Sequence, residues 1–211
     1  MYEGILPFIV GIIALAMSAV LLDKYRATKR MYHVLWSLGM FLWAISDFTQ
    51  FYAIVLKWTA AVYLAYFFSS IMLAGFLGAG TVYLASPKSK AAPIYFWFNV
   101  VAAIALLLAM LSTPLDSAAL QNAVAGANGM PGISNDIAAI VNIPALFTFV
   151  GGALYSYIRQ KRFYALLIAI GGAVPAVGGT LAAVAIPALL PYTDFIGIAF
   201  LSVGFYLSLS K

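Results

Sequence analysis

The sequence predicts an all-α polytopic integral membrane protein with seven transmembrane helices, its N-terminus outside and its C-terminus inside. The first observation is composition: the 211 residues are 65% hydrophobic and 8% charged, with a mean hydropathy of +1.04. A soluble domain of this size cannot bury so much apolar surface and keep a polar exterior. The second observation is that seven successive apolar segments, each long enough to cross a bilayer, use nearly the whole chain. The third is the distribution of charge.

Of the 11 lysine and arginine residues, all but Lys57 lie in connections on one side of the apolar segments. These cations are Lys24, Arg26, Lys29, Arg30, Lys88, Lys90, Arg159, Lys161, Arg162 and Lys211. The connections on the other side carry the acids Glu3, Asp116, Asp136 and Asp194. Short cationic loops stay in the cytoplasm, so this division predicts the orientation given above, with the protein as a multi-pass component of the cell membrane.

In chain order, the predicted spans are residues 5–22, 34–56, 59–85, 92–111, 137–158, 163–186 and 192–209. The tight connection at Lys57 makes the second and third spans a hairpin, and Pro87 and Pro93 bracket the inner turn before the fourth. The long outer connection, 112–136, is rich in Gly, Ala, Asn and Ser and has little to bury. We expect a surface-lying passive connector there, with a substrate lid as the alternative.

The first three spans and the last three look like two copies of one unit. Lys29-Arg30-Met31-Tyr32 aligns with Lys161-Arg162-Phe163-Tyr164, Gly39 with Gly171, Phe76-Leu77 with Phe200-Leu201, and Gly80 with Gly204. Because one extra span separates the copies, both cross the membrane in the same direction, as a parallel repeat. The single membrane domain, 1–211, then divides into a first unit (1–86), a linker helix with the outer loop (87–136) and a second unit (137–211). Chance recurrence of basic–aromatic pairs and glycines is the alternative.

This 3+1+3 layout with an outside N-terminus resembles that of the PQ-loop and SWEET transporters and, more remotely, that of the microbial rhodopsins. The resemblance covers the whole topology but no diagnostic motif. The chain contains no Pro-Gln pair, and the seventh span has no lysine that could hold retinal. The run LGAGTVYL at 77–84 is also similar to stretches of other prokaryotic membrane proteins. The resemblance implies a transporter fold, and the missing lysine argues against retinal.

Asp47 is the most informative polar position. It lies about 22 Å along the second span from Tyr32, past the middle of the membrane, where a carboxylate costs about 2.5–3.5 kcal/mol to insert. Ser46 and Gln50 share most of one helical face with it. We therefore expect Asp47 to face the bundle interior and to take up and release a proton. The alternative is a hydrogen-bonded anchor between helices.

The sixth span supplies a candidate hinge, because Gly171, Pro175 and Gly179 recur at a spacing of four residues. Pro175 removes a backbone donor and is expected to kink or open the helix. Close helix packing without any hinge is the alternative. The remaining candidates for a central polar site are Ser69, Ser70 and Thr180. The predicted cavity lies between the second and sixth spans, with the third and seventh completing its wall.

Several classes of function are disfavoured by what the sequence lacks. It contains no cysteine and a single histidine, His33, so neither a metal centre nor a haem is expected, and no cofactor is predicted. Enzyme motifs and a basic surface independent of the membrane are also missing, so neither catalysis nor nucleic-acid binding is expected.

Two functions remain open on the sequence alone. The first is a small-solute transporter or channel, proton-linked through Asp47. The alternative is a non-transporting sensor, scaffold or assembly subunit of a membrane complex. The expected partners are the lipid bilayer, a small solute or proton, and other membrane subunits or a second copy of the chain.

Overall fold

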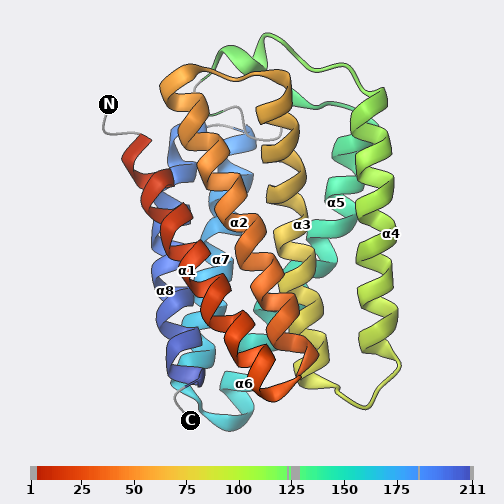
Figure 1. Cartoon of the computed structure of the whole chain (residues 1–211), viewed down its shortest axis with the longest axis vertical. Helices are drawn as coiled ribbons and strands as arrows, with labels where there is room; N and C mark the ends of the chain where they lie inside the picture. Colours follow the sequence, from red (N-terminus) through yellow and green to blue (C-terminus); the bar gives the residue numbers. More distant parts are fainter. Residues whose placement is uncertain (1–3, 123, 125–128, 185, 210–211) are drawn as a thin grey trace.

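The computed structural model describes residues 4–122, 124, 129–184 and 186–209. Within this part of the chain, seven helical segments are long and apolar enough to cross a membrane, as the sequence predicts. The seven segments lie side by side in one bundle (Figure 1). Glu3 and Lys211, assigned from the sequence to opposite sides, lie outside the described residues.

Six of the spans are each a single α-helix. They are α1 (Ile5–Thr28), α2 (Met31–Leu56), α3 (Ala60–Ala85), α4 (Ala91–Ser112), α7 (Phe163–Val184) and α8 (Leu190–Leu209). Short 3-10 turns, η2 (Ala119–Gln121) and η5 (Pro187–Leu189), lie in the connections. Helix α1 extends beyond the predicted end at residue 22, and an exposed ion pair between Arg26 and Asp23 lies on its last turns. A long charged side chain such as that of Arg26 can reach water from a helix turn near the membrane boundary, so the helix can extend past the apolar segment.

The fifth span has a local irregularity that the sequence analysis does not predict. It consists of α5 (Ile133–Leu146), a π-helical segment η4 (Phe147–Gly151) and α6 (Gly152–Gln160). Pro144 lies inside α5, just before the π segment. Because proline cannot donate a backbone hydrogen bond, it weakens the α-helical ladder at this point. Single π turns of this kind are rare and occur often at functional sites.

Two apolar cores hold the bundle together. One is centred on α3, which packs against α2, α4 and α5, and it contains Phe67, Met72 and Leu106. The other lies where α1 and α2 meet α7 and α8, and it contains Met40 and Leu201. Helix α8 packs against α1 as well as α7, so the first and last helices are neighbours. The space between the two cores is where the polar side chains described below meet.

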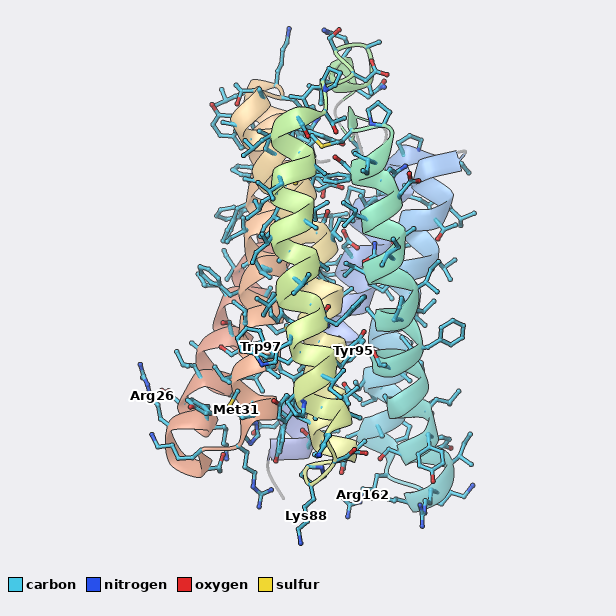
Figure 2. All side chains as sticks on the ribbon, turned by 90° about the vertical axis from the view of Figure 1, so that its right-hand side faces the viewer. Arg26, Met31, Lys88, Tyr95, Trp97 and Arg162 are labelled. Carbon is cyan, nitrogen blue, oxygen red and sulfur yellow. The ribbon has the colours of Figure 1, made fainter. Side chains whose placement is uncertain are left out.

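The cationic connections gather at one end of the bundle. Arg26, Lys88 and Arg162 lie at this end, opposite the end crossed by the 113–132 loop (Figures 1 and 2). Two of the helices reaching the cationic end finish in the same way. Lys29 after α1 and Lys161 after α6 both adopt the left-handed conformation, each with φ of 54°. A non-glycine residue adopts this conformation rarely, so the shared ending is a specific feature.

The described part of the 113–132 loop buries more than its polar composition predicts. The side chain of Met130 is fully buried in the core around α3. The indole Nε1 of Trp58 donates a hydrogen bond of 3.0 Å to the carbonyl of Asn122, and the amide of Asp116 donates one of 3.0 Å to the carbonyl of Gly129. The loop therefore covers the α2–α3 hairpin, because Met130 supplies an apolar anchor that the polar composition of the segment conceals.

Candidate functional site

Asp47 is buried inside the bundle, with 1% of its surface exposed. It lies on α2 nine residues before Leu56, which is about 14 Å from the end of the helix. Its Oδ1 atom has no hydrogen-bond partner among the described residues, whereas the side chain of Trp43, one turn earlier, interacts with the carboxylate. A carboxylate with an unsatisfied oxygen in apolar surroundings is costly, so a proton or a cation would stabilise it.

A second carboxylate, Asp194, lies close enough to Asp47 for the two charges to interact. The sequence analysis counts Asp194 with the acids of the outer side, at the start of the predicted span 192–209. In the structure it lies in α8, one turn after the helix begins at Leu190. The Tyr66 phenol on α3 also interacts with both carboxylates. Three helices that are far apart in the sequence therefore bring two acids and a phenol together.

A cavity of about 420 Å³ lies beside this group. Its walls come mainly from α3, the fifth span and α7, with smaller contributions from α2 and α8. The polar residues on the wall are Ser46, Tyr66, Ser70, Asn142, Thr180 and Asp194. The aromatic residues on it are Trp43, Tyr66, Phe67 and Phe149. The fifth span contributes more of the wall than the sequence analysis expects, and α2 contributes less.

The predicted polar residues divide into two groups. Ser46, Ser70 and Thr180 line the cavity, but Asp47, Gln50 and Ser69 do not. Gln50 is 1% exposed, and its Nε2 atom has no hydrogen-bond partner among the described residues. Asp47 and Gln50 therefore lie behind the wall, and Asp194 is the carboxylate that lines the cavity itself.

Three of the predicted site hydroxyls, those of Ser69, Ser70 and Thr180, bond to their own helices. Ser69 donates to the carbonyl of Ala65 at 2.7 Å and Ser70 to that of Phe67 at 3.0 Å. Thr180 donates in the same way to Ala176 at 2.9 Å. This is the usual behaviour of hydroxyls in membrane helices, and it leaves their oxygens free only as acceptors.

The three residues of the predicted hinge have different surroundings. Pro175 lines the cavity and packs against Gly197 of α8, while α7 continues through it without interruption. Gly179 also lines the cavity, and no atom would lie within 4 Å of a Cβ added to it. Gly171 instead packs against Leu201 of α8, so it serves the close approach of two helices. The expected opening of the helix at Pro175 is not seen.

The cavity continues toward the outer surface of the bundle between the fifth span and α7. An apolar groove on that surface shares Leu146, Val150, Ala176 and Thr180 with the cavity wall. Two residues of the wall, Ile143 and Leu146, are 59% and 41% exposed. Because the surface of a membrane bundle faces lipid, these shared and exposed wall residues place one side of the cavity next to the lipid-facing surface.

Sequence reasoning missed Asp194 and the π segment. A signal for the π segment was present in Pro144, which lies within an apolar stretch and frees a carbonyl one turn earlier. For Asp194, the predicted span 192–209 already contains the residue, and Pro187 and Pro191 mark the start of that helix, so the acid could have been considered as part of the bundle.

No protein-family model, curated protein or solved structure matches the chain. The resemblance to the PQ-loop and SWEET transporters therefore rests only on the number and order of the spans predicted from the sequence. The chemistry of the site has to be argued from its own side chains: two neighbouring carboxylates, a phenol and a largely apolar cavity.

Proposed function

We propose that this protein is a small-solute membrane transporter, linked to protons through Asp47 and Asp194. The observation that carries the proposal is a pair of interacting carboxylates beside a cavity of about 420 Å³ inside a membrane bundle. Two negative charges at close range in apolar surroundings repel each other. A proton or a bound cation relieves that repulsion, so occupancy of the cavity and protonation of the pair are coupled.

The orientation follows from the charge division, with the cationic end in the cytoplasm and the 113–132 loop outside. Asp47 and Asp194 then lie in the outer half of the membrane. The cavity beside them would load from that side. No catalytic step is needed in this scheme, and we propose no enzyme activity.

We further propose that the bundle is a parallel repeat of two three-helix units. The ends of α1 and α6 support it. Beyond the two left-handed lysines, Arg30 Nη1 donates to the Tyr32 hydroxyl at 3.1 Å, and Arg162 Nη1 donates to the Tyr164 hydroxyl at 2.8 Å. The same arginine–tyrosine pair thus begins α2 and α7, at positions that the sequence alignment matches.

Matching packing contacts support the repeat inside the membrane as well. A Cβ added to Gly39 of α2 would touch the side chain of Leu77 on α3. A Cβ added to Gly171 of α7 would touch the side chain of Leu201 on α8. These are the residues that the alignment pairs, so each unit brings its second and third helices together at the same place. The proposed cavity then lies between the two units, where parallel-repeat transporters bind their solutes.

A non-transporting sensor, scaffold or assembly subunit is the second candidate. It is favoured by the bonding of Ser70 and Thr180 to their own helices, which leaves few free donors for a hydrophilic solute. Stable co-purification of another membrane protein, together with an absence of flux, would support this alternative.

The test is proton flux in proteoliposomes that contain a trapped pH indicator. Each of four solutes (an amine, a sugar, a neutral amino acid and a carboxylate) is added outside, and the internal pH is followed. At least one solute should change the internal pH with the wild-type protein. Asp47→Asn should abolish that change, because the amide has the same shape but does not carry the proton.

Asp136→Asn is the matched control, since Asp136 is exposed in the first turn of α5. It should leave the flux unchanged. Circular dichroism and gel filtration check that each variant folds. Wild-type protein that moves protons with none of the solutes, or Asp47→Asn with an unchanged pH profile, would overturn the proposal.

A further inference from the structure

We propose that the cavity binds a small amphipathic cation, such as a protonated amine with an apolar body, in exchange for a proton. This inference rests on the proposed transport function and adds the class of solute. It is carried by the charge of the cavity, its aromatic wall and its position next to the lipid-facing surface.

The charge of the site selects a cation. Of the residues described around the cavity, only Asp194 is charged, and none is Lys, Arg or His. Directly behind the wall, Asp47 is 1% exposed, and one of its oxygens has no hydrogen-bond partner among the residues that the structure describes. An anionic solute would face two carboxylates with no compensating positive group, whereas a cation would satisfy both.

The residues that line the cavity favour a cation that carries an apolar group. Aromatic rings line the cavity at Trp43, Tyr66, Phe67 and Phe149, and most of the other lining residues are aliphatic. Aromatic faces attract ammonium groups, by about 2 kcal/mol or more where water is excluded. The volume of about 420 Å³ lies toward the small end of the roughly 300–1,000 Å³ range for ligand pockets. A sugar would leave its hydroxyls without partners on such a wall.

The side of the cavity next to the lipid-facing surface is consistent with an amphipathic solute. The groove on the lipid-facing side is lined by apolar residues and by Thr180, whose hydroxyl is bonded to its own helix. An amine with an apolar body partitions into the bilayer interface and reaches this groove without crossing water. A strongly hydrated ion would have no such route.

The exchange needs only the groups that face Asp47. These are Trp43 on its own helix, Tyr66 on α3 and Asp194 on α8. The residues that α7 and the fifth span bring to the cavity are not titratable. When the cation binds, the carboxylate pair releases its one proton to water. One positive charge replaces another, so the net charge of the site does not change.

The experiment is isothermal titration calorimetry of the full chain in detergent with three matched probes. Benzyltrimethylammonium is the cation, neopentylbenzene is its uncharged carbon isostere, and phenylacetate is an aromatic anion. Only benzyltrimethylammonium should bind with high affinity. Repeating the titration in buffers of different ionisation enthalpy should show proton release, and binding should weaken as the pH falls.

Asp194→Asn and Asp47→Asn should each lower the affinity for benzyltrimethylammonium at least tenfold, while Asp136→Asn should leave it unchanged. Gly179→Leu is a second, charge-neutral test, because its side chain would grow into open space on the cavity wall. It should block binding while both carboxylates remain. This variant keeps the proposal testable if an aspartate variant fails to fold.

Three results would overturn the inference: equal binding of the cation and its uncharged isostere, unchanged affinity in Asp194→Asn, or binding without proton release. The flux assay separates this failure from failure of the transport proposal. Proton-linked flux of a sugar or a neutral amino acid, with no amine binding, would sustain transport and refute the cation. Absence of any flux together with proton-releasing amine binding would refute transport and leave a cation-sensing site.

Discussion

Two adjacent glycines of α7 should respond differently when each is replaced by alanine. Gly178 packs so closely on Thr193 of α8 that an added Cβ would overlap the Oγ1 and Cβ atoms of the threonine. Gly179 faces the cavity, and an added Cβ would meet no atom within 4 Å. The pair therefore compares a tight helix contact with the open cavity wall at neighbouring positions of one helix.

The expected difference in stability between Gly178→Ala and Gly179→Ala follows from two terms. Within a helix, replacing Gly by Ala favours folding by about 1 kcal/mol, because the backbone has less freedom to lose. This gain is common to both variants and cancels between them. The overlap at Gly178 remains and costs about 1–3 kcal/mol. Thr193 cannot easily rotate away, since its hydroxyl is bonded to the carbonyl of Leu190 at 2.9 Å. Gly179→Ala should therefore be the more stable variant by about 1–3 kcal/mol.

Reversible unfolding by sodium dodecyl sulfate in mixed micelles measures this difference. The change can be followed by the fluorescence of the 4 tryptophans in the chain. Gly179→Ala should unfold at a higher detergent fraction than the wild type, and Gly178→Ala at a lower fraction than Gly179→Ala. Equal stabilities, or the reverse order, would mean that α7 is rotated about its axis and that Gly179 does not face the cavity.

Two further predictions concern topology and helix packing. The chain has no native cysteine, so Asp116→Cys should react with an impermeant maleimide on intact cells and Lys88→Cys only after lysis; the opposite pattern would reverse the orientation. Ser18 and Ser37 each donate a 2.8 Å hydrogen bond to the other's backbone carbonyl. Each alanine variant should lose about 0.6 kcal/mol of stability in the same unfolding assay, and the double variant less than the sum, whereas additive losses would show that the two residues act independently.

The sequence was sufficient for the number of apolar spans and for the position of Asp47 along α2. Both depend on local quantities: the length of each apolar segment and the rise of 1.5 Å per residue along a helix. The grouping of the cationic connections at one end follows from the same count of spans. The described part of the chain accordingly contains seven long apolar helices, with Arg26, Lys88 and Arg162 at one end (Figure 2).

Asp194 could not be assigned in the same way. Its membership of the site depends on where α8 begins and on how that helix is rotated against α2 and α3. Neither is set by hydropathy, since an acid in the first turn of a span looks like an acid in the preceding loop. The wall provided by the fifth span was missed for a related reason. Its rotation depends on the π segment at Phe147–Gly151, which changes the helical register within an otherwise uniform apolar run.

The π segment at Phe147–Gly151 gives the fifth span one residue more than a regular α-helix of the same length would hold. A π turn contains about one residue more than an α turn, and in a regular α-helix that residue would turn one half of the span by about 100° relative to the other. The wider turn takes up this residue, so the face that α5 turns toward the cavity and the face that α6 turns toward α7 are set separately.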